Sequence, residues 1–347
     1  MSLMSKQVTV RLPFLRFKFP SAILLGMLLL SAIILATSIG AVSIPVSDLV
    51  TSRLTEQQQA VLFSIRLPRV LLAIVVGVAL AVSGAALQGL FRNPLADPGL
   101  IGISTSAALA VAIVIVFAGP LTGLLGLYSL SIAAFLGAII SCFVIFRFAR
   151  LSGKFSVTYM LLTGIALNAI CAAGVGILTF LSNDEQLRTL TFWTMGSLGG
   201  ALWPSVIVAA TIVVPASILL IRSARELNLL LLGENEARYL GVDEEKLKRM
   251  VIIATALTVG AAISVSGIIG FVGLVVPHLV RLLLGPDHRL LIPASGILGA
   301  SLLLVADTIA RTIVAPAEMP VGILTSLIGG PFFLWLLVKQ YSGRFGI

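Results

Sequence analysis

Few residues of this chain could do chemistry, and several of them lie at the ends of apolar runs. Arg66 and Arg69 stand together in the segment SIRLPRVLLA, and Arg311 ends another apolar run. A guanidinium group can donate two parallel hydrogen bonds to a carboxylate, so these arginines could recognise acidic groups on a partner. The alternative is that they snorkel from an apolar segment toward water. The residue types alone permit both interpretations.

The histidines and cysteines do not form a metal-binding pattern. His278 and His288 are the only two histidines, and each lies near an arginine toward the end of an apolar run, where a hydrogen bond at a helix end is the simpler interpretation. Cys142 and Cys171 lie inside apolar stretches and lack the spacing of metal ligands or of a disulfide framework. We therefore expect no metal site in this chain.

Nucleotide chemistry and proton transfer are also poorly represented. Gly153 and Lys154 are followed by Ser156, but the upstream glycine and the preceding strand of a phosphate-binding loop are missing. Any energy from ATP must therefore come from another chain. No carboxylate lies at the middle of an apolar run, with Asp307 coming closest, whereas ion-coupled transporters keep such groups inside the membrane. We expect no catalytic residue and no cofactor in this chain, which is predicted not to be an enzyme.

The elements that must position these residues are membrane-spanning helices. Of the 347 residues, 59% are hydrophobic and 11% are charged, whereas an ordinary soluble domain has about 25% charged residues. This composition excludes a soluble enzyme and a disordered chain. The net charge is +9, and the lysines and arginines that produce it flank apolar runs. We therefore expect a lipid membrane and no nucleic acid as partner. The chain is predicted to be an all-α polytopic membrane protein with a single transmembrane domain over residues 1–347.

About ten apolar runs are long enough to be membrane spans. They cover residues 20–41, 69–90, 99–118, 128–147, 157–181, 201–222, 249–267, 269–284, 291–314 and 320–339. The stretch after Met250 is split in two because about 35 continuous residues exceed one span. With the N-terminus inside, only five of the 23 lysines and arginines lie outside: Arg53, Arg66, Arg69, Arg188 and Arg311. Both termini are therefore expected in the cytoplasm.

One long charged segment, residues 222–250, is expected on the cytoplasmic side. Glycines interrupt its helical periodicity, acidic residues interleave with basic ones, and Leu240, Val242 and Leu247 are expected to be exposed. Short amphipathic helices of this kind either lie on a membrane surface or dock into a groove of a partner. The acidic residues disfavour an anionic lipid surface, so this coupling loop is predicted to dock on a partner protein.

A second irregular segment, LQGLFRNPLADPGLIGIS, separates two of the predicted spans. Its prolines and glycines are typical of a tight turn, but the same segment could form a constriction of a pore. Irregular backbone at membrane depth survives only where protein or a water-filled cavity covers it.

Four separated motifs resemble the permeases of type II ABC importers. They are RLPRVLLAIVVGVALAVSGAALQGLFRNPLADPGLIGIS, FVGLVVPHLVR, DHRLLIPASGILGASLLLVADTIAR and EMPVGILTSLIGGPFFLWLL. The resemblance runs from the first span to Lys339. It implies the ten-helix permease fold of that family and a homodimer in the bacterial inner membrane, working by alternating access. It also implies two ATP-binding cassette subunits on the cytoplasmic face, which bind ATP and Mg, and a periplasmic substrate-binding protein that delivers the cargo.

The resemblance also implies roles for individual residues. The residues implied to dock the binding protein, by pairing with its glutamates, are Arg66, Arg69 and Arg311. Those implied to couple to the ATPase are Gly233, Glu234, Ala237, Leu240 and Gly241, of which Glu234 and Ala237 would set the contact. Those implied to form the gate and the translocation path are Asn93, Leu95, Val157, Thr158, Gly164 and Ala169.

The substrate stays open within the family. The stretch LRTLTFWTMGSLGGALW is more similar to the haem and siderophore branch than to the cobalamin branch, so haem is expected first, ferric siderophores next and cobalamin third. From other classes, an ion-coupled secondary transporter is the main alternative, followed by a channel or a membrane scaffold.

Overall fold

The computed structural model describes residues 18–40, 42–51, 53–118, 123–150 and 155–345, and every regular element in these ranges is a helix. Seven helices are long and apolar enough to cross a membrane. They are α1 (Lys18–Ser38), α4 (Leu67–Leu90), α6 (Gly123–Ala149), α7 (Val157–Leu181), α9 (Trp203–Arg222), α12 (Glu244–Ser266) and α14 (His288–Ala310). Shorter apolar stretches form α5 (Ile103–Phe117), α13 (Val272–Leu284) and the first part of α15 (Val321–Phe345). The predicted all-α fold of about ten membrane helices is confirmed.

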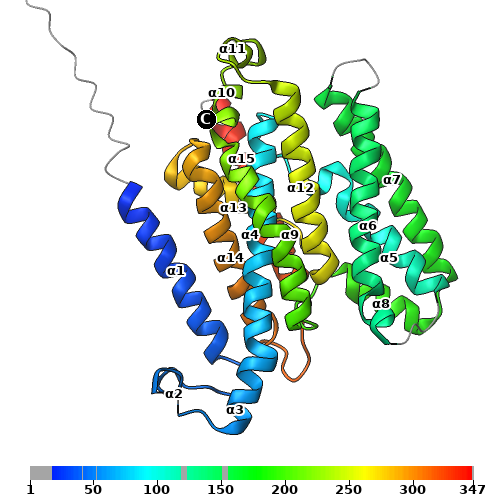
Figure 1. Ribbon diagram of the computed structural model, residues 1–347, viewed down its shortest axis with the longest axis vertical. Helices are drawn as coiled ribbons and strands as arrows, with labels where there is room; N and C mark the ends of the chain where they lie inside the picture. Colours follow the sequence, from blue (N-terminus) through cyan, green and yellow to red (C-terminus); the bar gives the residue numbers. More distant parts are fainter. Residues whose placement is uncertain (1–17, 41, 52, 119–122, 151–154, 346–347) are drawn as a thin grey trace, which may run out of the picture.

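The long helices run side by side, with the short helices gathered at the two ends of the bundle (Figure 1). At one end lie α10 (Ala224–Leu230), α11 (Glu234–Tyr239) and the C-terminus of α15. The opposite end carries α2 (Val46–Thr51), α3 (Glu56–Val61) and, farther across, α8 (Asp184–Thr194). We call these the α11 end and the α3 end. The group α5 to α8 stands at one side of the bundle.

Helix α4 forms the centre of the bundle and packs on α9, α12, α13 and α14. Small residues allow these close approaches. A Cβ atom placed on Gly77 would lie 2.5 Å from the carbonyl oxygen of Gly299 on α14. A hydrogen bond of 2.6 Å between the hydroxyls of Ser83 and Thr258 joins α4 to α12. The core therefore holds α4 rigidly against the helices that carry the candidate site residues.

Two non-helical segments meet beside the middle of α4. Residues 267–271 separate α12 from α13, which confirms the predicted break, and Gly267 and Phe271 both have φ of 66°. Residues 91–97 descend from the end of α4 to η3 (Pro98–Ile101). A Cβ on Gly273 would lie 3.1 Å from the Leu80 carbonyl oxygen and 3.5 Å from Asp97 Oδ2. The apolar runs carry no carboxylate at their middle, but the fold brings Asp97, from the segment after α4, beside the middle of that helix.

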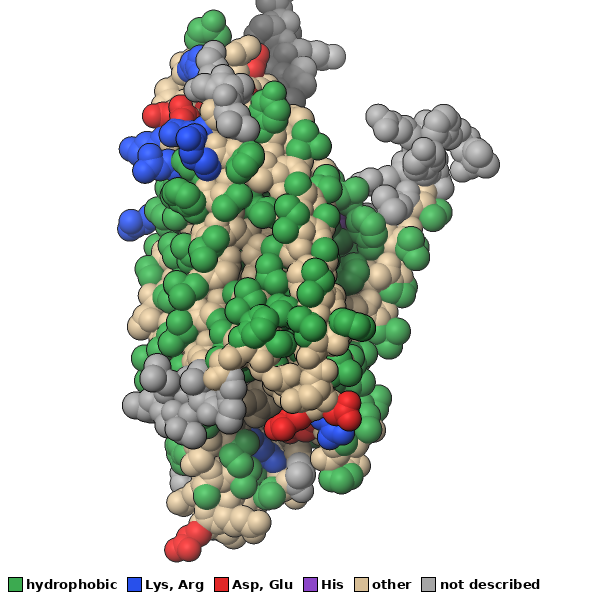
Figure 2. Space-filling model, turned by 90° about the vertical axis from the view of Figure 1, so that its right-hand side faces the viewer, with side chains coloured by type: hydrophobic (Ala, Val, Ile, Leu, Met, Phe, Trp, Pro, Cys, Tyr) green, Lys and Arg blue, Asp and Glu red, His purple; other side chains and the backbone are tan. Residues whose placement is uncertain are grey.

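The outer surface of the bundle matches a membrane environment. Figure 2 shows hydrophobic side chains over the middle of one face, with lysine, arginine and acidic side chains toward its two ends. The exposed apolar residues include Leu24, Phe143 and Ile207, which come from three different membrane helices. Such a belt would be unfavourable in water and is suited to lipid.

Candidate functional site

Arg69 is the centre of a charge cluster at the α3 end. Its Nε and Nη2 donate hydrogen bonds to Asp307 of α14 at 2.9 and 3.0 Å. Its Nη1 donates to both carboxylate oxygens of Glu318 at 2.9 Å. Glu318 lies just before α15, and its side chain is 48% exposed, whereas that of Asp307 is 5% exposed. One guanidinium group therefore joins α4, α14 and the beginning of α15.

The other two predicted docking arginines, Arg66 and Arg311, bind backbone carbonyls at the end of α1. Nη1 of Arg66 donates to Thr37 at 2.6 Å and to Ser38 at 3.1 Å, and Nη2 donates to Val42. Arg311 donates to the carbonyl oxygen of Ala36. The last carbonyls of a helix have no partner within the helix and carry a partial negative charge. These two cations therefore satisfy the C-terminal end of α1.

The structure thus buries all three arginines that the sequence predicts for docking. Arg66 and Arg69 are 3% and 6% exposed, and the side chain of Arg311 is 8% exposed. The snorkelling alternative is wrong here, because the guanidinium groups turn into the protein and not toward water. Their role in docking stays a prediction. Glu318 was missed by the sequence analysis because its partner Arg69 is 249 residues away in the chain.

At the α11 end, ion pairs centred on Glu234 attach α11 to its neighbours. Its Oε1 lies 2.8 Å from Lys248 Nζ on α12 and 3.7 Å from Arg92 Nη2, which follows α4. Lys248 is buried and also lies 3.4 Å from Glu244. The hydrogen bond from Lys248 lowers the pKa of Glu234. A displacement of α11 would therefore act on both α12 and the end of α4.

Glycines begin and end α11 because the backbone there is left-handed or otherwise disfavoured for side chains. Gly233 has φ of 133° and Gly241 has φ of 86°. The N–H of Gly241 donates to the Arg238 carbonyl and that of Val242 to the Ala237 carbonyl. These bonds satisfy the last carbonyls of the helix, as a glycine at this position commonly does. The two glycines give this segment a fixed shape.

The exposed side of α11 differs from the sequence expectation. Ala237, Val242 and Leu247 are buried, because α11 and the start of α12 close over one another. Tyr239 and Leu240 are 91% and 58% exposed at the tip of the molecule. Ala237 therefore cannot touch a partner in this arrangement. Leu240 was predicted for this surface, and Tyr239 was missed although the sequence places it beside Leu240.

Helix α7 packs one face on α5, α6 and η3 and leaves the other face open. Ser156 caps its start by accepting from the Tyr159 N–H, and the helix has the bounds that the sequence predicted. Gly164 is buried, and its carbonyl would lie 3.4 Å from a Cβ on Gly102. Gly164 therefore serves packing, and Val157 is half-buried. The exposed face carries Thr158, Leu162, Ile165, Ala166, Ala169 and Ala172.

The predicted inner constriction lies in the segment that descends from α4. The Asn93 side chain accepts a hydrogen bond of 3.0 Å from the Leu95 N–H and so holds a tight turn. Leu95 lines a hollow together with Asp97, Phe271 and Phe333. The segment therefore forms the predicted turn, and the hollow beside it leaves the constriction interpretation open. A role in gating stays a prediction.

A polar site beside this turn was missed by the sequence analysis. Asp97 Oδ1 accepts a 2.7 Å hydrogen bond from the Gly99 N–H. Asn168 of α7 donates to the Gly99 carbonyl at 3.4 Å and accepts from the Thr105 hydroxyl at 2.6 Å. These residues line a cavity of about 270 Å³ together with Leu80 of α4. The signal available was Asp97 itself, the one acidic residue of that segment, placed before Pro-Gly.

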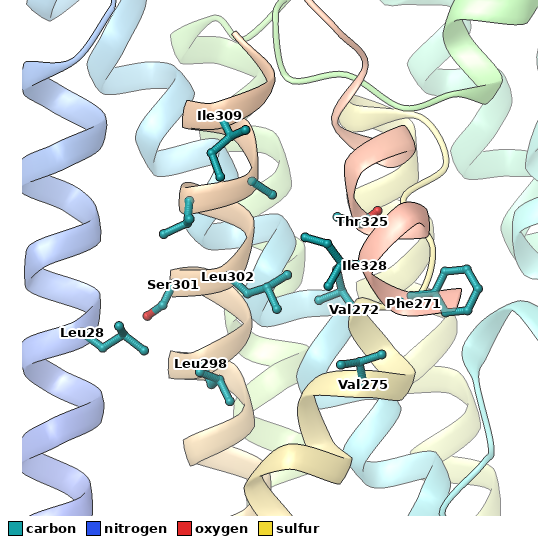
Figure 3. Close-up of a pocket in the computed structure, with 13 residues that line it drawn as sticks. Leu28, Phe271, Val272, Val275, Leu298, Ser301, Leu302, Ile309, Thr325 and Ile328 are labelled. Atoms are coloured by element: carbon teal, nitrogen blue, oxygen red, sulfur yellow. The ribbon is translucent and has the colours of Figure 1, made fainter. Parts of the chain in front are cut away.

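An apolar groove lies between α1, α13, α14 and α15 (Figure 3). It has a volume of about 250 Å³, and its lining includes Leu28, Leu302 and Ile328. The hydroxyl groups of Ser301 and Thr325 bond to carbonyls of their own helices. The groove therefore offers hydrocarbon contacts and no polar recognition.

Both histidines lie within the bundle. His288 Nδ1 is 2.8 Å from the side-chain oxygen of Asn228. The ring centroids of His278 and Phe332 lie 6.3 Å apart in a T-shaped arrangement. Across the part of the chain that the structure describes, no group of three or more His, Cys, Asp or Glu residues could hold a metal ion.

Comparison with known proteins places this geometry in a family. Residues 28–339 match the model of the FecCD transport family. A hemin transport system permease, HmuU of Yersinia pestis, is 51% identical over 93% of this chain and 98% of its own length. A cobalamin import permease, BtuC of Halobacterium salinarum, is 43% identical over 81% of this chain and 74% of its own. A vitamin B12 import permease, BtuC of Salmonella typhi, is 39% identical over 91% and 94%.

The fold is also similar to a solved structure. A chain described as a metal-chelate type ABC transporter in an inward-facing conformation superposes with a TM-score of 0.83. It is 35% identical, and the match covers 92% of this chain and all of the solved one. Sequence and fold comparisons therefore agree along nearly the whole chain.

Proposed function

This chain belongs to the FecCD transport family, and we propose that it is the membrane permease of an ATP-driven importer that carries haem into the cytoplasm. The observation that carries the choice of haem is the 51% identity to a hemin permease over nearly all of both chains. The cobalamin and vitamin B12 permeases are 43% and 39% identical. Ferric siderophores and cobalamin are the competing cargoes.

The open face of α7 supports a homodimer with the path between the two copies. Thr158, Ala169 and Ala172 lie on this face, which combines small and apolar side chains. A wall of this kind can let a large, flat and mainly apolar cargo slide past without holding it tightly. A second copy would cover the face and close the path. Affinity for the cargo would then reside in a separate binding protein.

The exposed tip of the α11 end supports docking of an ATP-hydrolysing partner there. Tyr239 and Leu240 offer an apolar contact, and the ion pairs of Glu234 connect this tip to α12 and α4. Docking into a groove is a common use of such short helices. In this orientation the α11 end faces the cytoplasm, the coupling loop 222–250 is cytoplasmic, and ATP and Mg are bound by the partner. The α3 end then faces the periplasm and receives a substrate-binding protein at the cluster of Arg66, Arg69 and Arg311.

The experiment that tests the substrate is uptake by proteoliposomes that contain the permease, its ATPase and its binding protein. We expect ATP-dependent accumulation of haem, and weaker or no accumulation of a ferric hydroxamate siderophore or cobalamin added at the same concentration. Accumulation of cobalamin in preference to haem would contradict the choice of cargo but keep the importer.

The same vesicles separate the importer from an ion-coupled transporter. An ionophore that collapses proton and sodium gradients should leave haem uptake unchanged, whereas omission of ATP should abolish it. Uptake that needs a gradient and ignores ATP would contradict the proposed energy source. Equilibration without accumulation would instead indicate a channel.

A further inference from the structure

We propose that Glu318 is an internal ligand of Arg69 that a carboxylate of the delivery protein must displace, and that this exchange releases the beginning of α15. The inference rests on the proposed function, because it needs a partner that docks at the α3 end.

The bonding of the three buried arginines leaves a single replaceable contact. Arg66 and Arg311 bind backbone carbonyls of α1, which cannot leave without unfolding the helix end. Asp307 is buried with Arg69 inside the bundle. Glu318 is the exception, because its side chain is about half exposed while it holds Nη1 of Arg69 with both oxygens. A carboxylate arriving from outside meets Arg69 at this edge.

In this exchange one carboxylate replaces another on Arg69. A partner carboxylate can make the same two hydrogen bonds to Nη1 that Glu318 makes, so Arg69 does not lose its pairing. With Glu318 in place, two carboxylates face three guanidinium groups, so the cluster already has one positive charge in excess. When Glu318 turns away, one buried carboxylate remains and the cluster attracts an anion more strongly. The buried arginines can therefore recognise acidic side chains although none is exposed.

Glu318 also connects this exchange to the helices around the path. A Cβ on Gly199 would lie 2.8 Å from Glu318 Oε2, so the carboxylate is held between α4 and the segment that joins α8 to α9. Two residues beyond Pro320, Gly322 is packed against the carbonyl oxygens of Met195 and Ile268. Close to Glu318, therefore, the first turn of α15 meets the end of α8 and the break after α12. Release of Glu318 would loosen this junction on the periplasmic side.

The test compares wild-type permease with Glu318→Gln in nanodiscs, using the purified periplasmic haem-binding protein of the same organism as probe. The variant keeps the size of the side chain but removes the competing charge. We expect its affinity for the probe to rise by roughly three- to tenfold at physiological ionic strength, with a smaller gain at high salt. Glu185→Gln is the matched control, since it removes another exposed acid at the same end and should change affinity much less.

A second measurement follows the junction itself. Amide hydrogen exchange of residues 321–325, which are largely buried, should increase when the probe docks on the wild type and should already be raised in Glu318→Gln without it. Glu318→Asp keeps the charge, so a folded but weakened pairing should give intermediate exchange. These signals are read on folded protein and do not depend on transport.

Each outcome decides between the claims. Weaker or unchanged capture by Glu318→Gln, with normal capture by the wild type, would overturn the exchange, because Glu318 would then contact the partner itself or take no part. Unchanged exchange of residues 321–325 on docking would overturn the release of α15. No capture by the wild type would instead contradict docking of a binding protein as proposed above, and the inference with it.

Discussion

The side chain of Asn228 holds His288 at the start of α14. Its Oδ1 accepts from the His288 N–H at 2.9 Å and lies 2.8 Å from Nδ1 of the ring, while its Nδ2 donates to Asp287 at 2.7 Å. Asn228 belongs to α10, which leads into α11, and the His288 ring lies against Gly89 of α4. One amide therefore links the proposed ATPase-docking segment to a membrane helix.

Replacing Asn228 by leucine should uncouple ATP hydrolysis from uptake. Leucine has about the same size but leaves the His288 N–H and the Asp287 carboxylate without this partner, at a cost of about 1–3 kcal/mol. We expect the ATPase to copurify and hydrolyse ATP, while haem uptake per ATP falls roughly tenfold. Asn228→Asp keeps the accepting oxygen and should retain part of the coupling. Equal losses of hydrolysis and uptake would point to misfolding instead.

The pairing of Arg69 with Asp307 predicts a large effect on stability. Arg69→Met leaves Asp307 buried, with Arg311 Nε at 4.0 Å as its remaining cation, and should cost about 3 kcal/mol. Because the unpaired charge is what destabilises, Arg69→Met combined with Asp307→Leu should recover most of the loss. Denaturant titration in mixed micelles would measure both variants and Asp307→Leu alone. A double variant as unstable as the sum of its parts would contradict this account.

The tip of α11 gives opposite predictions for two neighbouring positions. Tyr239→Ala should leave the permease folded and weaken capture of the ATPase by roughly 1–3 kcal/mol, as truncation of an exposed aromatic anchor does. Ala237→Arg should disrupt the segment itself, because Ala237 has no exposed surface. Copurification with the ATPase together with thermal unfolding would separate loss of contact from loss of fold. Normal capture by Tyr239→Ala would remove this residue from the interface.

Much of the fold was predictable because each membrane helix carries its own signal. The run 157–181 has the bounds of α7, since Ser156 caps one end and Ser182 ends the other. The length of the apolar stretch after Met250, which exceeds one span, predicted the break between α12 and α13. These features depend on local hydrophobicity, capping and backbone freedom, which a single sequence contains.

The site was less predictable because its contacts join distant segments. Nothing near Arg69 in the sequence indicates Asp307 or Glu318, so the arginine was expected at a surface and not in a buried cluster. The short helix α11 has too few residues to reveal which side turns inward, so Ala237 was assigned to the wrong side. The depth of Asp97 likewise depends on how the segment after α4 folds back.

Acidification should loosen the attachment of α11 to α12. The hydrogen bond from Lys248 lowers the pKa of Glu234 below its ordinary value of about 4.3. A carboxylate with a lowered pKa in the folded state stabilises that state above the unfolded pKa, and the contribution is lost as pH falls through the folded pKa. Exchange of α11 amides, corrected for intrinsic rates, should therefore be constant between pH 8 and about pH 5 and rise below about pH 4. Glu234→Gln should show raised exchange at all these pH values, and a rise confined to neutral pH would contradict the assignment.

Two glycines within membrane helices should respond oppositely to substitution by alanine. On α4, a Cβ at Gly84 would collide with the carbonyl oxygen of Gly273, and backbone cannot move aside as a side chain could. Gly84→Ala should therefore destabilise the permease by about 2–3 kcal/mol and push apart the segments that meet at Asp97. On α7, no atom lies within 4 Å of a Cβ at Gly176, so Gly176→Ala should be neutral or stabilise by up to about 1 kcal/mol through helix propensity. Thermal unfolding of both variants in the same detergent measures the difference. A strong loss of stability for Gly176→Ala in membranes, but not in detergent-solubilised monomers, would place Gly176 at the contact with a second copy. Similar losses of stability for both variants in monomers would contradict the packing described for α4.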